Sequence, residues 1–455
     1  MLVNIISEKM EEMNLILLKN YLYLYGVYLT DELFEFLCES QYSDYRTTQG
    51  IFLKLGGTYD RENYNTISDS TNYEDYLRQR EYVTAGIHKL SDIDKNYLEE
   101  NTHFILDKDD ENNLILSGKY IYNNEKHSIE FKDIGFFKLD GHKEELQAGG
   151  IRMRDSIMDS NCIGGCNFCD FGHSFKNYIP NFLTEDRRKY LIDLIKELCE
   201  NRNVDTLFIT GGNPDIEDME IWTDFVKSTI EEFHKYSPNG NIDFMITPRG
   251  FDKYVYDEEI RYEEYKRYLE HLKLIGANTI SPNMELWDEE KLNKWCPKHN
   301  KLGTAKSEIG HDGYLDFIKA GIEVFGKFNI RSSFILGLNS IEDVKKAIDS
   351  LIPMGCYVGL EPFVIPCNSF GAFNKFQPKI EELIELSEYL DNKLREEFIK
   401  LPTEQVTEFK RRISTSFNAH AAHNTANSIS WQELDTIEKR AISQGIDNTI
   451  IRRVE

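Results

Sequence analysis

The chain has 455 residues, of which 29% are charged, and its formal net charge is −25. This charge repels phosphate backbones and anionic lipids, so the composition argues against nucleic acid and membranes as general partners. The first 12 residues lack the basic and apolar regions of a signal peptide, no apolar run spans a bilayer, and 8 cysteines are too few for a disulfide scaffold. We therefore expect a protein of the reducing cytoplasm.

Residues 1–145 are expected to form a separate N-terminal α+β module. An apolar stretch from Leu15 to Leu37 has a helical or mixed pattern. Two strands, Asn113 to Tyr122 and His127 to Leu139, flank the turn-forming residues 123–125 and predict a hairpin. No catalytic motif falls in this module.

A cysteine-rich loop follows, with Cys162, Cys166 and Cys169 in a CxxxCxxC spacing. Three thiolates at these spacings can hold three irons of a [4Fe-4S] cube and leave the fourth iron without a protein ligand. Zinc is the alternative, because a tetrahedral site needs only one more Cys or His, and His173 follows the loop closely.

From about Gly149 onward, strands alternate with amphipathic helices, which predicts a parallel sheet with crossover helices. Ser340 is the expected N-cap of the helix after the fifth strand. The six expected strands are Ile151 to Met158, Thr206 to Gly211, Ile242 to Thr247, Thr279 to Leu286, Ile330 to Leu338 and Tyr357 to Ile365.

The ends of these strands carry polar and glycine-rich motifs, as barrels of parallel strands require for their active sites. Gly211, Gly212 and Asn213 end the second strand, where glycines let the backbone approach a ligand closely. The fourth strand alternates Ser281, Asn283 and Glu285 on one face, which we expect to point into the barrel.

The fifth strand places Asn329, Arg331, Ser333 and Ile335 on one side by the same alternation. A guanidinium inside a barrel needs an anion. Its partner is either a bound carboxylate or Glu361 on the sixth strand.

The cysteine spacing, Phe168 before the last cysteine and the order of these motifs resemble the radical S-adenosylmethionine (SAM) superfamily. The resemblance implies a partial (β/α)6 TIM-like barrel over residues 146–400, followed by a helical extension over residues 401–455. It also implies a [4Fe-4S] cluster on the three cysteines and bound SAM.

The resemblance further implies the SAM contacts, and the barrel resembles the biotin synthase and methylornithine synthase branch, with no subfamily identified. Gly211, Gly212 and Asn213 would meet the SAM amino group, with Asn213 standing where an acidic residue is common. Asn283 and Glu285 would hold the ribose hydroxyls. In the fifth strand, Arg331 would bind the carboxylate, Ser333 would line the site, and the segment from Ile335 would meet the adenine, ending in Asn339 where the family pattern ends in an acidic residue.

A radical SAM enzyme with these parts would take an electron from a donor such as flavodoxin or ferredoxin and cleave SAM to a 5'-deoxyadenosyl radical. The radical would abstract hydrogen from a small polar metabolite, an amino acid or nucleoside derivative, for rearrangement, fragmentation or bond formation. Two alternatives stay open: a radical SAM maturase that recognises a precursor peptide through residues 1–145, and a zinc-binding protein without catalytic activity.

The remaining candidates are weaker. His420 and His423 share one helical face but do not make a coordination sphere. Cys296 with His299, and Cys367 at the end of the sixth strand, lie near the expected active site but are too few for a second cluster. Cys38 and Cys199 are expected in the core, and Cys356 at the stability-related end of the sixth strand.

Overall fold

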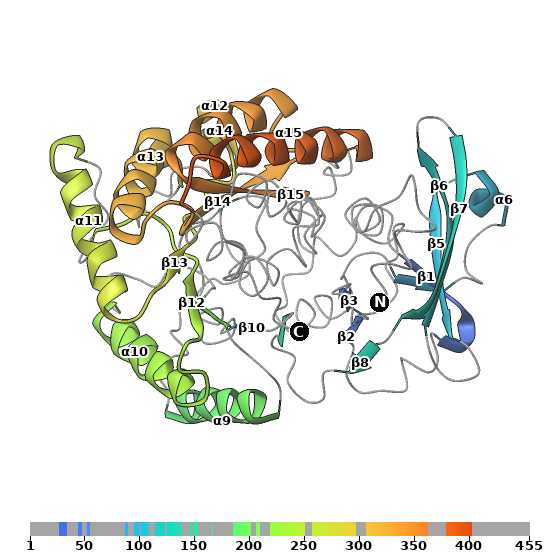
Figure 1. The fold of residues 1–455 in the computed structure, drawn as a ribbon, viewed down its shortest axis with the longest axis horizontal. Coiled ribbons are helices and arrows are strands. Elements are labelled where there is room, and N and C mark those ends of the chain that lie inside the picture. The colour runs from blue at the N-terminus through green and yellow to red at the C-terminus, as the bar shows by residue number, and fades with distance from the viewer. Residues whose placement is uncertain are drawn as a thin grey trace, which may run out of the picture. The chain divides into compact units, whose positions relative to one another are not determined.

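The computed structural model describes residues 27–33, 44–47, 52–54, 87–89, 95–100, 102–108, 114–122, 125–134, 136–138, 146–147, 150–152, 166, 185–201, 206–209, 219–250, 257–296, 306–362 and 379–402. The chain divides into two compact units, residues 1–143 with 364–380 and residues 144–363 with 381–455. Each unit has its own sheets (Figure 1). Among the described residues, no helix combines the length and the apolar character needed to cross a membrane.

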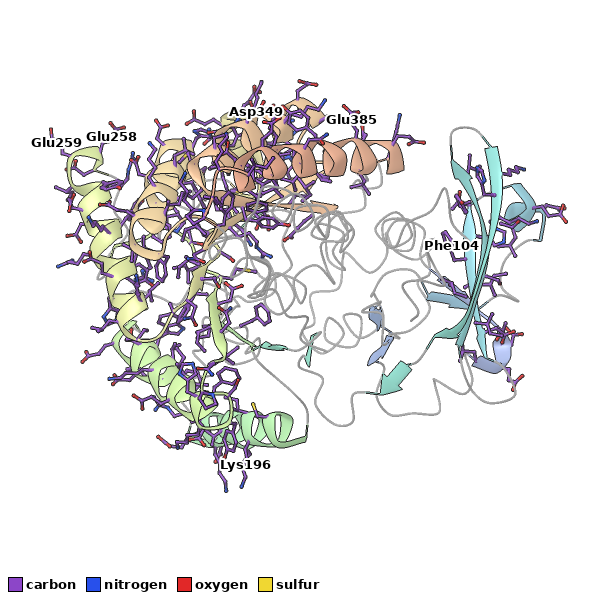
Figure 2. The ribbon with its side chains drawn as sticks, in the orientation of Figure 1. Phe104, Lys196, Glu258, Glu259, Asp349 and Glu385 are labelled. Carbon is purple, nitrogen blue, oxygen red and sulfur yellow. The ribbon has the colours of Figure 1, made fainter. Side chains whose placement is uncertain are left out.

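The first unit contains a five-stranded sheet in the order β4-β1-β5-β6-β7. Its strands are β1 (Val27–Leu29), β4 (Ile87–Lys89), β5 (His103–Lys108), β6 (Leu114–Tyr122) and β7 (Glu125–Ile134), with α6 (Lys95–Glu100) before β5. Strands β4, β1 and β5 are parallel, whereas β5, β6 and β7 run antiparallel. Phe104 and Leu116 are fully buried and contribute the apolar face of this sheet (Figure 2).

The predicted hairpin is confirmed, because β6 and β7 pair from Tyr122 opposite Glu125 to Leu114 opposite Ile134. Its second strand is shorter than expected and ends at Ile134. The residues that follow enter a different, three-stranded antiparallel sheet in the order β3-β2-β8. This sheet consists of β2 (Asp44–Thr47), β3 (Phe52–Lys54) and β8 (Phe136–Lys138).

The second unit is built on a seven-stranded sheet in the order β15-β14-β13-β12-β11-β10-β9. Only the pair β9–β10 is antiparallel, and the other neighbours are all parallel. The strands are β9 (Leu146–Gln147), β10 (Gly150–Arg152), β11 (Thr206–Ile209), β12 (Asn241–Phe244), β13 (Thr279–Ile280), β14 (Ile330–Leu336) and β15 (Cys356–Pro362). The six predicted parallel strands are thus present and adjacent in chain order, as a partial (β/α)6 barrel requires.

Helices connect these strands and lie along one side of them in Figure 1. They are α9 (Glu185–Asn201), α10 (Met219–Tyr236), α11 (Glu258–Leu274), α12 (Glu289–Trp295), α13 (Lys306–Phe325), α14 (Ile341–Met354) and α15 (Ile380–Phe398). Charged side chains such as Lys196, Glu258 and Asp349 lie exposed on the outer helix faces (Figure 2). The inner faces bury apolar side chains against the sheet, as in the row Val344, Ala347, Ile348 and Leu351 of α14.

Local sequence signals fix both ends of α14. Ser340 is its N-cap, as predicted, and forms a capping box with Asp343. At the other end Gly355 adopts the left-handed conformation with φ +98°, and its N–H donates to the carbonyl of Ile352 at 3.0 Å. Any other residue would be strained there, so glycine ends the helix and lets the chain enter β15.

The expected fourth strand from Thr279 to Leu286 is wrong in its extent, because β13 ends at Ile280. Pro282 has no N–H for a strand ladder, and Glu285 has a left-handed φ of +71°. Only an isolated bridge between Glu285 and Phe334 continues the pairing. Side chains of β14 replace the lost ladder, since Ser332 Oγ accepts from Met284 N at 3.0 Å. The third and fifth strands also end earlier than expected, at Phe244 and Leu336.

Candidate functional site

The predicted site residues on β14 and on the segment after β13 lie together in the second unit. Asn283, Arg331 and Ser333 are buried, while Glu285 is half-buried. Cys166 is described and buried as well. Ile335 on β14 is also described and buried. Six further predicted site residues lie outside the described residues: Cys162, Phe168, Cys169, Gly211, Gly212 and Asn213.

The backbone after β13 is held in place by side-chain hydrogen bonds. Asn283 Oδ1 accepts from the backbone N–H of Ser333 at 3.2 Å. Asn339 donates through Nδ2 to the carbonyl of Glu285 at 2.8 Å and accepts through Oδ1 from the N–H of Trp287 at 2.9 Å. By the resemblance described above, Asn339 is expected to replace an acidic residue, and an ionised carboxylate could not donate the first of these bonds. The amide of Asn339 therefore holds the backbone at Glu285 in place.

Lys306, at the start of α13, is a site residue that the sequence motifs do not indicate. Its Nζ donates to the carbonyl of Asn283 at 2.5 Å and lies 3.4 Å from Glu285 Oε1. Burial lowers the pKa of Lys306, but Tyr314 and Glu285 raise it, and the net shift is upward. Lys306 is therefore a cation inside the site. It lies 21 residues after Glu285 in the sequence, and the fold brings the two side chains together.

Glu285 is balanced between its charged and neutral forms. Burial raises its pKa to about 7, Lys306 and Arg331 oppose this rise, and Glu361 adds to it. The competing partner that the sequence suggested for Arg331, the carboxylate of Glu361, thus belongs to the same electrostatic group. A carboxyl group with a pKa near neutrality can exchange a proton or accept hydrogen bonds within the physiological range.

A second cysteine lies directly beside Cys166. Cys296 is the C-cap residue of α12, and its thiol donates to Cys166 Sγ over 3.4 Å. This hydrogen bond and burial raise the pKa of the Cys166 thiol, whereas Lys306 lowers it. Metal binding must therefore displace a proton from Cys166, as it does for any thiolate ligand. His299, the other residue of the Cys296 motif, lies outside the described residues.

Three buried polar atoms around this group have no hydrogen-bond partner within the described part of the chain: Glu285 Oε2, the Tyr314 hydroxyl and Ser333 Oγ. Leaving such atoms unpaired costs roughly 1–3 kcal/mol each. A polar ligand with hydroxyl and charged groups would satisfy them. The residues present therefore fit a SAM-like ligand next to a cysteine-bound metal centre.

The described residues alone do not complete a metal site, because no three His, Cys, Asp or Glu side chains among them converge on one point. The other two cysteines of the CxxxCxxC loop belong to residues outside that part of the chain. The same holds for Cys38, His173, Cys367, His420 and His423. Cys356 begins β15 and is buried, and it pairs with Ile330, the neighbour of the predicted site residue Arg331.

A comparison with models of protein families gives a match over part of the chain. Residues 157–351 match the model of the radical SAM superfamily. A search of curated proteins found no significant match. The superfamily consists of enzymes that use a [4Fe-4S] cluster and SAM, which are the cofactors that the cysteine loop and the barrel motifs predict.

Solved structures with a similar arrangement show low identity and low TM-scores. The FeFe-hydrogenase maturase HydG from Carboxydothermus hydrogenoformans is 16% identical over 52% of this chain and 49% of its own, with a TM-score of 0.37. Methylornithine synthase (PylB) is 15% identical over 64% of this chain and 81% of its own, also with a TM-score of 0.37. The chain spans about half the length of the HydG structures. The match to the radical SAM superfamily covers residues 157–351, which is less than half of the chain.

Proposed function

We propose that this chain is a radical SAM enzyme that acts on a small polar metabolite, an amino acid or nucleoside derivative. Cys162, Cys166 and Cys169 would hold the cluster. A protein such as flavodoxin or ferredoxin would supply the electron. The reaction after hydrogen abstraction would be a rearrangement, a fragmentation or the formation of a bond.

One observation carries this proposal: the buried thiol of Cys166 shares a site with the ionisable groups of Glu285, Lys306 and Tyr314. A structural zinc knuckle needs four ligands and no such polar surroundings. A SAM-binding cluster needs both a cysteine loop and a polar cavity wall for the ligand. The unpaired Glu285 Oε2, Tyr314 hydroxyl and Ser333 Oγ are suited to form that wall.

When bound, the cluster and SAM would supply a one-electron cleavage that yields methionine and a 5'-deoxyadenosyl radical. The work of the protein is to bind, orient and shield. Glu285 Oε2 would accept hydrogen bonds from the ribose hydroxyls, and Arg331 would attract the SAM carboxylate. Gly211, Gly212 and Asn213 would approach the amino group. Lys306 would keep Glu285 in its ionised form while SAM is bound.

The test is anaerobic purification followed by assays for iron, sulfide and zinc. We expect about four irons per chain and a broad visible absorption. Reduced protein incubated with SAM should then release 5'-deoxyadenosine, detected by mass spectrometry. Cys166→Ala should lose most of the iron and the product.

Cys356→Ala is the control, because Cys356 is also a buried cysteine and its thiol donates to the carbonyl of Tyr357 at 3.6 Å, not to Cys166. It should keep both the iron and the 5'-deoxyadenosine. Zinc without iron in the wild-type protein would refute the proposal. Undiminished product from the Cys166→Ala protein would show that this residue is not a cluster ligand.

A further inference from the structure

Cys296 approaches the cluster loop from a distant part of the sequence. Its sulfur lies 3.4 Å from Cys166 Sγ although 130 residues separate the two cysteines. Both side chains are buried, at 0% and 5% exposure. The position of Cys296 is fixed by α12, because its backbone N–H donates to the carbonyl of Leu292 at 2.8 Å. The contact between the two cysteines is therefore set by the packing of α12 and not by a local sequence motif.

The geometry does not suit Cys296 as a further ligand of the same cluster. Each iron of a [4Fe-4S] cube already has three sulfides and takes a single outer ligand, so Cys166 and Cys296 cannot share one iron. Ligands of neighbouring irons point outward along different diagonals of the cube and lie much farther apart than 3.4 Å. A thiol that donates a hydrogen bond to a ligand sulfur, however, lies at this distance.

We infer that Cys296 donates its S–H to the Cys166 sulfur in the cluster-loaded protein and thereby helps to set the reduction potential of the cluster. This inference rests on the cluster binding proposed above. Cys296 acts through Cys166, so it is a positioning residue and not a catalytic one.

The expected direction follows from charge. Reduction adds an electron to the cluster, and hydrogen bonds to the cysteine sulfurs stabilise the more negative state. The Cys296 thiol and the Lys306 ammonium, which interacts electrostatically with both cysteines, act in the same direction. Both would make the cluster easier to reduce. Removing the thiol should therefore shift the midpoint potential to a more negative value.

The experiment compares four reconstituted proteins: wild type, Cys296→Ala, Cys296→Ser and the control Cys356→Ala. Iron and sulfide are measured first, and the midpoint potential is then taken from a redox titration followed by electron paramagnetic resonance. Cys296→Ala should titrate at a more negative potential than the wild type, and Cys296→Ser, which keeps a hydroxyl donor, should lie between them. Cys356→Ala should match the wild type, because the Cys356 thiol donates to the carbonyl of Tyr357 at 3.6 Å and not to Cys166.

Resonance Raman spectra give a second readout that does not depend on turnover. Loss of a hydrogen bond to Cys166 should raise the frequency of an Fe–S(Cys) stretching band in Cys296→Ala and leave it unchanged in Cys356→Ala. Equal potentials and equal bands for the two alanine proteins would overturn the inference. Loss of iron from both Cys296 variants would also overturn it, because Cys296 would then be a ligand. A wild-type protein without iron would instead refute the proposed function.

Discussion

Four charged residues meet at the candidate site: Glu285, Lys306, Arg331 and Glu361. Two cations and two carboxylates can cancel, but burial penalises each charge separately. For Glu285 the effect of burial is clear, because its pKa is raised to about 7. A ligand that donates hydrogen bonds to Glu285 would favour the ionised form and lower that pKa again. The group is thus arranged to respond to binding.

The raised pKa of Glu285 predicts a pH dependence of stability. A carboxyl group whose pKa is higher in the folded than in the unfolded protein binds more protons when folded, so its stabilising effect is lost as pH rises through the folded pKa. With a folded pKa of about 7 against the ordinary 4.5, this loss begins near pH 4.5 and is nearly complete once the pH has passed about 7. Glu285→Gln removes the titration, and relative to this variant the wild type should lose roughly 1 kcal/mol between pH 6 and 8.

Thermal unfolding of SAM-free protein under anaerobic conditions, at several pH values, measures this difference. Glu323→Gln on α13 is the control, because Lys266 and Tyr262 lower the pKa of Glu323 and keep it ionised throughout this range. The control should follow the wild type. A difference between wild type and Glu285→Gln that stays constant with pH would contradict the expected titration.

At this scale the sequence predicts some site residues and misses others for a clear reason. Period-two alternation on the fifth strand selects Arg331 and Ser333, and both are buried in the structure. Lys306 and Tyr314 are missed, because their roles depend on contacts between distant segments that no local pattern records. Cys296 is indicated only as a weak candidate, and its contact with Cys166 is not predicted. Two residues shorten β13, and only one of them could be predicted. Pro282 is evident in the sequence as a residue that breaks a strand, whereas the left-handed φ of Glu285 is known only from the structure.

Among the elements, α14 follows its sequence signals most closely, and its N-terminus is suited to a quantitative test. Asp343 Oδ2 accepts from Ser340 Oγ at 2.6 Å and from Lys291 Nζ at 2.7 Å, which ties α14 to α12. Ser340→Ala removes one donor from Asp343 and the cap of the helix. It should lower the stability of this unit by about 1 kcal/mol.

The measurement is the unfolding temperature of the cluster-loaded protein, which should fall by about 2–4 °C. Ser340→Thr keeps a capping hydroxyl and should lose clearly less. Equal losses from alanine and threonine would mean that the hydroxyl is not the source of the effect, and that local packing is.

The order of the strands in the second unit was predictable, because neighbouring strands of its parallel sheet also follow one another in the sequence. Strands β10 to β15 are adjacent in chain order, so alternation of patterns was enough to predict the parallel sheet. Strand ends were less predictable, since they depend on hydrogen bonds such as that between Asn283 and Ser333. In the first unit the hairpin could be predicted from its turn residues. The parallel pairing of β1 with β4 and β5 could not, because it joins segments far apart in the chain.

For the whole molecule, the net charge of −25 governs how protein partners approach. Flavodoxins and ferredoxins that carry negative charge should be repelled at long range, so a reductant of this kind would meet the site against an electrostatic barrier. Raising the ionic strength from about 0.01 M to about 0.15 M shortens the screening length from about 30 Å to about 8 Å. The barrier should therefore shrink as salt is added.

We accordingly predict that an acidic flavodoxin reduces the cluster several-fold faster at the higher ionic strength. Stopped-flow absorbance under anaerobic conditions measures this rate, and an uncharged small-molecule reductant serves as the control, because its rate should change little with salt. A rate that falls with added salt would show that a local basic surface outweighs the net charge and attracts the donor. The same wild-type protein is used with both reductants. A rate that rises with salt therefore indicates that the total charge dominates the approach of the flavodoxin, and a rate that falls indicates that a local basic surface dominates it.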